Sequence, residues 1–160
     1  PEENPRLELL GQMIHEARES EQKIIVWARF NREMNQICAI YGDEIMRYDG
    51  QVSDRAKRVN LDRFLDPNDG QAWILGAKVR SLAHGITANI AKGMMYYSND
   101  PSPEKRLQSL DRNHRIGQDS PIFVVDIAAH DSFDIKQLEA FDKKQATEAY
   151  VLRDVMEMLR

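Results

Sequence analysis

Lys23-Ile24-Ile25-Val26-Trp27-Ala28 is a short run without the alternation of apolar and polar residues that a half-buried strand shows. A continuous run of this length is typical of a strand that is buried on both faces, as the strands of a parallel sheet are. Four more short runs follow along the chain, at residues 44–48, 72–75, 93–97 and 122–125. The sequence therefore predicts a sheet of five strands.

Helical patterns lie before and between these runs, around residues 5–17, 34–41, 53–64 and 103–114, and again from residue 133 onward. Ser53 is the expected N-cap of the third helix. Strands that alternate with helices of this length form βαβ units with right-handed crossovers. The predicted fold class is α/β, a three-layer parallel sheet, in a single domain of residues 1–160 with a helical tail at 133–160.

The loops that follow the predicted strands contain unusual residues. Ligands bind at the carboxyl ends of the strands in such sheets. The loops expected there are Arg29-Phe30-Asn31, Tyr48-Asp49-Gly50, Gly76 to Gly85, and Ser98-Asn99-Asp100. By contrast, the acidic pair Asp43-Glu44 lies where a strand begins, so we interpret it as a solvated turn and expect no metal site in this chain.

The composition, 42% hydrophobic and 30% charged residues, is ordinary for a globular domain. No apolar run approaches the roughly 20 residues of a membrane helix, and the first residues do not resemble a signal peptide. The single cysteine fits a reducing compartment, so a cytoplasmic location is expected. No partnership with a membrane is predicted.

The net charge of −4 is unevenly distributed along the chain. Residues 47–118 carry 12 basic and 8 acidic side chains, a net +4, whereas each flanking region carries 5 basic and 9 acidic side chains, a net −4. A positive middle section is where an anionic ligand would be held. A solvated surface of mixed charge is the alternative interpretation, and charge alone does not exclude it.

The segment with the strongest chemical signal is Gln108-Ser109-Leu110-Asp111-Arg112-Asn113-His114-Arg115-Ile116-Gly117-Gln118. On a helix, Gln108, Arg112 and Arg115 share one side, while Leu107, Leu110 and His114 gather nearly opposite and would pack on the sheet. Two arginines one turn apart repel each other unless an anion lies between them, and a guanidinium matches a phosphate well. The pattern predicts a phosphate clamp. The alternative is a surface helix whose arginines pair with Asp111 and Glu104.

The same segment closely resembles motif VI of the Swi/Snf-type helicase-like ATPases of superfamily two, matching eight of its eleven positions. Other segments follow in the order of that family: 23–30 as motif IV, then Asp49-Gly50 with its basic helix, and 73–91 as motif V. The resemblance implies the C-terminal RecA-like helicase lobe of a double-stranded DNA translocase. Motifs IV to VI would then lie within residues 23–118.

The resemblance also implies roles for single residues. Arg112 and Arg115 would reach the γ-phosphate of ATP as arginine fingers, with Arg115 as the first choice, and Gln108, Asp111 and Gly85 would help to bind the nucleotide. The implied contacts to the DNA backbone are Arg29, Asn31, Lys78, Arg80 and Thr87. ATP and Mg²⁺ would be held mainly by an N-terminal RecA-like lobe of the same polypeptide.

Two departures from the family pattern bear on function. Motif V keeps Gly85 but lacks the usual pair of glycines, a form that suggests a bacterial or phage protein. No Gly-x-x-x-x-Gly-Lys-Ser/Thr sequence is present, so this lobe alone should not hydrolyse ATP. Two alternatives remain open: an adaptor that keeps the fold without motor activity, and an unrelated α/β phosphate-binding protein.

Overall fold

The computed structural model describes residues 4–78, 81, 90–111, 122–128 and 134–143. The chain divides into two units, residues 1–127 and residues 128–160. In the second unit, residues 134–143 form a helix, as expected for the start of the tail.

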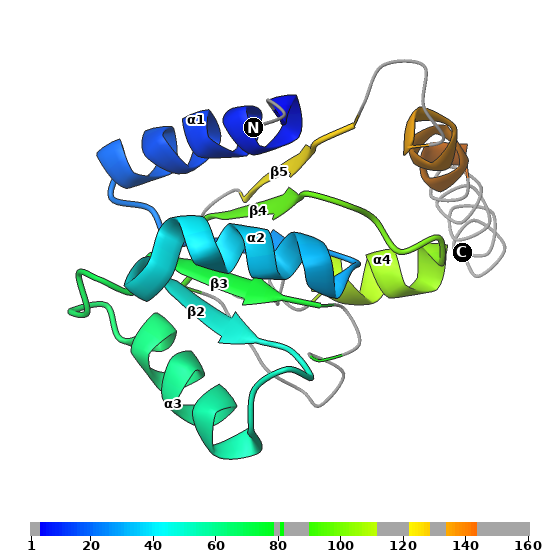
Figure 1. The fold of residues 1–160 in the computed structure, drawn as a ribbon. Coiled ribbons are helices and arrows are strands. Elements are labelled where there is room, and N and C mark those ends of the chain that lie inside the picture. Colours follow the sequence, from blue (N-terminus) through cyan, green and yellow to red (C-terminus); the bar gives the residue numbers. More distant parts are fainter. Residues whose placement is uncertain (1–3, 79–80, 82–89, 112–121, 129–133, 144–160) are drawn as a thin grey trace, which may run out of the picture. The chain divides into compact units, whose positions relative to one another are not determined.

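The first unit contains one five-stranded parallel sheet in the order β2-β3-β1-β4-β5 (Figure 1). The strands are β1 (Ile24–Trp27), β2 (Ile45–Tyr48), β3 (Ile74–Ala77), β4 (Gly93–Tyr96) and β5 (Phe123–Asp126). The helices are α1 (Pro5–Glu19), α2 (Asn31–Tyr41), α3 (Asp54–Leu65) and α4 (Pro103–Asp111), with a short 3-10 turn η1 (Gly42–Glu44). The predicted α/β class, the number of strands and their parallel direction are confirmed.

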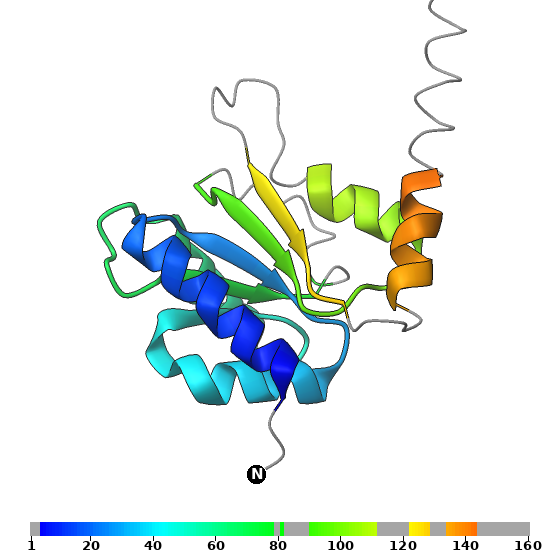
Figure 2. The same ribbon diagram turned by 90° about the horizontal axis from the view of Figure 1, so that it is seen from above.

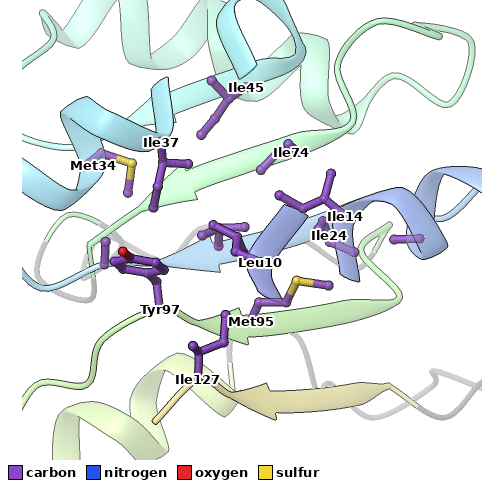
Figure 3. Close-up of a cluster of buried hydrophobic side chains, with 13 residues drawn as sticks. Leu10, Ile14, Ile24, Met34, Ile37, Ile45, Ile74, Met95, Tyr97 and Ile127 are labelled. Atoms are coloured by element: carbon purple, nitrogen blue, oxygen red, sulfur yellow. The ribbon is translucent and has the colours of Figure 1, made fainter. Parts of the chain in front are cut away.

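Apolar side chains cover both faces of the sheet, which explains the continuous apolar runs. On one face, α1 and α2 contribute Leu10, Ile14, Met34 and Ile37 to a buried cluster (Figure 3). On the other face, α3 and α4 pack on a second cluster formed by the opposite side chains of the same strands. Figure 2 shows α1 and α2 on one side of the sheet and α4 on the other. The arrangement is three-layered, as predicted.

The third strand lies two residues later than predicted, because Gly76 is part of the sheet and not of a loop. Gly76 pairs with Val26 of β1 and with Arg47 of β2. A Cβ atom on Gly76 would lie 2.7 Å from Ile45 Cδ1 and 2.9 Å from Met34 Sδ, so these side chains need a glycine beneath them. The strand consequently ends at Ala77, and Lys78 is the first residue beyond it.

Helix starts follow the sequence closely. Ser53 caps α3 through a hydrogen bond from the Ala56 amide to its Oγ at 3.2 Å, as predicted. Asn4 caps α1 in the same way, with Pro5 in the first turn. No described helix is long and apolar enough to cross a membrane.

Candidate functional site

A pocket of about 300 Å³ lies at the carboxyl ends of β1, β3 and β4. Its lining comes from the first residues after each strand and from the start of α4: Trp27, Ala28, Arg29, Phe30, Lys78, Ser98, Asp100, Pro101 and Lys105. Three cations and one carboxylate thus face a common hollow, at the edge where parallel sheets bind their ligands.

Backbone hydrogen bonds fix the wall that contains Arg29 and Phe30. The Arg29 amide donates to Ser98 Oγ at 2.8 Å, and Ser98 Oγ in turn donates to the Glu33 carboxylate. The Phe30 amide donates to Glu33 Oε2 at 3.1 Å. These contacts join the turn after β1 to the loop after β4. The side chains of Arg29 and Phe30 stay exposed. The Arg29 guanidinium lies over the Phe30 ring, 4.8 Å from its centre, and that ring is 51% exposed.

The other two cations have side-chain partners at the pocket. Lys78 Nζ donates to Asn31 Oδ1, and Lys105 Nζ donates to Asp100 Oδ2 at 3.1 Å. Burial raises the pKa of Asp100, but the Ser102 amide and the charges of Lys105 and Arg29 outweigh it, so the pKa lies below its usual value. Asp100 is therefore charged at neutral pH, and the three cations exceed the negative charge of the lining.

The structure brings together three residues that the sequence proposed as DNA contacts. Arg29 and Lys78 line the same pocket, and Asn31 touches Lys78 although it lies 47 residues earlier. The proposed contacts Arg80 and Thr87 lie outside the described residues, so their roles stay predictions.

Of the proposed nucleotide-binding residues, Gln108 and Asp111 lie on α4, and both are exposed. Gly85, Arg112 and Arg115 lie outside the described residues, and their roles also stay predictions. The described part of this helix reaches Asp111, the residue directly before Arg112 in the sequence.

The prediction for the sheet-facing side of α4 is only partly right. Both leucines are partly buried, but only Leu110 belongs to the described cluster on the sheet, as expected, and Leu107 does not. Arg106 and Ser109 are the buried residues of this helix. Polar residues can occupy these positions because Asp126 neutralises the Arg106 guanidinium and Tyr96 hydrogen-bonds Ser109.

Sequence reasoning missed Lys105, Ser98 and Asp100 as residues of the site. The loop 98–100 was placed at the correct edge, but nothing local indicated that Lys105 points back to it. The available signal was position: Lys105 lies in the first turn of a helix that starts directly after a strand and its loop. First-turn residues of such helices lie at the carboxyl edge of the sheet.

The loop after β2 is closed by its own side chains. Asp49 is fully buried and receives two hydrogen bonds from Arg47, at 3.0 and 2.9 Å, and one from the Gln51 amide at 2.9 Å. Its acceptor positions are therefore largely used within the fold. At the opposite edge, Asp43 is exposed and Glu44 pairs with Arg18, which confirms that this acidic pair is a turn. Among the described residues, no group of three or more metal-ligating side chains occurs.

The fold and the basic pocket together define an α/β lobe with a five-stranded parallel sheet and three cations around one pocket at its carboxyl edge. The family model of the helicase conserved C-terminal domain matches residues 5–117, which is more than half of the chain. The chain belongs to this family, which confirms the predicted C-terminal helicase lobe. The match also removes the alternative of an unrelated phosphate-binding protein.

Curated relatives include a SWI/SNF-related regulator of chromatin, a DNA repair protein and a chromatin-remodeling ATPase. The chain is 24% identical over 147 residues to the SWI/SNF-related matrix-associated actin-dependent regulator of chromatin subfamily A member 1 of Mus musculus, covering 90% of this chain and 14% of that protein. It is 28% identical over 142 residues to DNA repair protein rad8 of Schizosaccharomyces pombe, covering 85% and 12%. It is 23% identical over 151 residues to the ISWI chromatin-remodeling complex ATPase ISW1 of Saccharomyces cerevisiae, covering 92% and 13%.

A solved structure confirms the fold. The C-terminal part of the Fun30 ATPase domain superposes with a TM-score of 0.73 at 17% identity, over 84% of this chain and 44% of that one. The chain spans only 12% to 14% of the length of the three relatives named above. Those relatives are eukaryotic, and they give no support to the bacterial or phage origin that the altered motif V suggested.

Proposed function

We propose that this chain is the C-terminal motor lobe of an ATP-dependent double-stranded DNA translocase or helicase. An N-terminal RecA-like lobe of the same polypeptide binds ATP and Mg²⁺. This lobe supplies Arg112 and Arg115 to the γ-phosphate as arginine fingers, with Gln108, Asp111 and Gly85 at the nucleotide. A guanidinium placed there stabilises the charge that develops during phosphoryl transfer.

The observation that carries the proposal is the pocket with Arg29, Lys78 and Lys105. DNA presents closely spaced phosphates, and a protein that tracks the backbone needs cations that are exposed and not committed to buried ion pairs. Arg29 is exposed, Lys78 and Lys105 are partly exposed, and all three line one hollow, where the partners of the two lysines are side chains at its rim. Asn31 and, from the predicted set, Arg80 and Thr87 complete the contacts. Such binding is independent of base sequence and weakens steeply with salt.

The motor is tested by DNA-stimulated ATP hydrolysis of the protein that includes the N-terminal lobe. Arg115→Ala should lower turnover by a factor on the order of 10³ or more, because the charge on the transferred phosphoryl group loses its partner. Arg18→Ala is the matched control, since it removes a partly exposed arginine whose partner is Glu44 on the opposite edge. Circular dichroism of each variant checks that the fold is intact.

The competing function is an adaptor that keeps the helicase-lobe fold without motor activity. The loss of the glycine pair in motif V favours it, since that loop approaches the DNA in the family. Unchanged hydrolysis in Arg115→Ala, or none in the wild type with an intact N-terminal lobe, would transfer our support to the adaptor. A cytoplasmic location stays a prediction from the single cysteine.

A further inference from the structure

A buried ion pair joins α4 to the end of β5. Arg106 donates from Nη1 to Asp126 Oδ1 at 2.6 Å and from Nη2 to Asp126 Oδ2 at 2.7 Å, and the arginine is only 9% exposed. Two parallel hydrogen bonds of this kind fix the plane of the guanidinium as well as its position. The pair is therefore geometrically more demanding than a lysine–carboxylate contact.

Tyr96 of β4 makes two further contacts with α4. The Arg106 guanidinium lies 3.5 Å from the centre of the Tyr96 ring, and Tyr96 Oη is 2.6 Å from Ser109 Oγ. Ser109 Oγ donates to the Arg106 carbonyl at 2.7 Å, so the phenol is the donor to Ser109. Burial raises the pKa of Tyr96 to about 12, which keeps this donor protonated at neutral pH. Two successive turns of α4 are thus tied to one strand.

Asn99 connects this network to the pocket. Its Oδ1 accepts from Arg106 Nη1 at 2.7 Å, and its Nδ2 donates to Asp126 Oδ1 at 2.9 Å. The next residue, Asp100, binds Lys105 at the pocket. The adjacent loop residues Asn99 and Asp100 therefore bind the adjacent α4 residues Arg106 and Lys105. The second pair lines the pocket, and the first pair does not.

We propose that Arg106 is a positioning residue for ATP hydrolysis, and that its ion pair with Asp126 sets the rotation of the helix that leads into the finger arginines. The exposed side of α4 carries Gln108 and Asp111, while the side fixed by Arg106 is buried. The inference rests on the proposed function of Arg112 and Arg115, which follow this helix directly in the sequence.

A purely structural role would be met more simply by an apolar residue. Burying a guanidinium carries a large desolvation penalty, and replacement of buried ion pairs by apolar side chains is often neutral or stabilising. An apolar residue at position 106 would fill the space over Tyr96, but it would not select one rotation of the helix. The fixed geometry matters where a small displacement of a catalytic group lowers the rate by about a hundredfold.

Arg106→Lys tests the inference in the protein that includes the N-terminal lobe. Lysine keeps the charge but loses the two parallel hydrogen bonds, so kcat should fall by roughly tenfold to a hundredfold. The KM for ATP and the affinity for DNA should stay within about twofold, since the residue touches neither. Arg63→Lys, which alters the Arg63–Asp69 pair at the other edge of the sheet, is the matched control and should retain the wild-type kcat.

A double variant separates positioning from general loss of structure. Single-turnover rate constants, measured with enzyme in excess over ATP, do not scale with the folded fraction. Arg106→Lys should lower this constant in the wild-type background but change it less than about twofold in Arg115→Ala, because Arg115, the first choice for the finger, is no longer there to be positioned. An equal fall in both backgrounds, or a wild-type rate in Arg106→Lys alone, overturns the inference. If Arg115→Ala is itself without effect, the proposed function fails first, and the two failures are distinguishable.

Discussion

The two edges of the sheet use the same kind of side chain in opposite ways. At the amino edge, Lys23 is only 7% exposed, and its ammonium group donates to the carbonyl oxygens of Phe64 at 2.9 Å and Asp66 at 2.6 Å. At the carboxyl edge, Lys78 and Lys105 are partly buried, and each contacts a side chain at the rim of the pocket. Lys23 is buried and binds carbonyl groups at the end of α3, whereas Lys78 and Lys105 lie where an anion can reach them.

The difference lies in the partners of the lysines. The carbonyl groups at the end of α3 have no partner within the helix, so Lys23 satisfies a fixed requirement of the fold. The partners of Lys78 and Lys105 are instead the side chains of Asn31 and Asp100, and not carbonyl groups of a helix end. Burial lowers the pKa of Lys23 despite the nearby carboxylates Asp69 and Asp66. Whether a lysine can bind an external anion therefore depends on whether its present acceptor would be left buried without a donor. The residue type alone does not decide it.

The largest expected effect is on DNA binding at the carboxyl edge. In the triple variant Arg29→Ala, Lys78→Ala, Lys105→Ala, the slope of log affinity against log salt should become shallower by about 2.7, or 0.9 for each phosphate contact. At about 0.1 M salt this corresponds to a loss of affinity on the order of a hundredfold or more. Fluorescence anisotropy with labelled duplex DNA, over a series of salt concentrations, measures both quantities.

Lys92→Ala is the control for this experiment, because Lys92 is a partly buried lysine next to the amino end of β4. It should leave both the affinity and the salt slope unchanged. A triple variant that binds DNA like the wild type would show that the duplex lies elsewhere, and the contrast between the edges would then have no functional meaning.

The second-largest expected effect is a lower free energy of unfolding when the buried lysine of the amino edge is replaced. Lys23→Ala leaves carbonyl oxygens of α3 buried without their charged donor, and each such hydrogen bond contributes about 1.5–3 kcal/mol. We expect the free energy of unfolding to fall by about 2–3 kcal/mol, measured by urea denaturation with tryptophan fluorescence. Lys57→Ala, which removes only the helix-surface contact to Asp54, should change it by less than about 0.5 kcal/mol. Equal stability in the two variants would contradict the structural role of Lys23.

Sequence patterns predicted the framework of this fold because parallel sheets impose a local signature. Each strand is covered on both faces, so each is an apolar run whatever its neighbours are. Ser53 could be assigned as a cap because its partner, Ala56, lies three residues away. Arg29, Asn31 and Lys78 could be assigned to the site because they lie shortly after predicted strands and the family resemblance implies contacts to DNA there. All of these features depend on short stretches of chain.

Features that depend on distant partners were not predicted. Lys23 was placed in a strand with no sign that it would cap a helix about 40 residues later. Arg106 was not singled out, since its partner Asp126 lies 20 residues away and its ring contact comes from Tyr96 of another strand. Gly76 was assigned to a loop because the side chains that require it come from β2 and α2. In each case tertiary packing decides the role of the residue.

The smallest effect concerns acid stability and again separates the edges. The hydrogen bond from Arg63, supported by the Gln71 amide, lowers the pKa of Asp69 to about 2. As the pH falls, the unfolded chain binds this proton before the folded protein does. The contribution of Asp69 to stability is therefore present above about pH 4 and is lost as the pH falls towards 2.

Asp69→Asn should remove this part of the pH dependence. Urea unfolding at several values between about pH 5 and pH 2 should give a shallower dependence of the unfolding free energy on pH than in the wild type. Asp54→Asn is the control, because its side chain is 88% exposed, and it should follow the wild-type curve. If Asp69→Asn also follows that curve, the Arg63–Asp69 pair does not stabilise the folded state. Of the two charged contacts compared at the amino edge, that of Lys23 would then be the one that stabilises the fold.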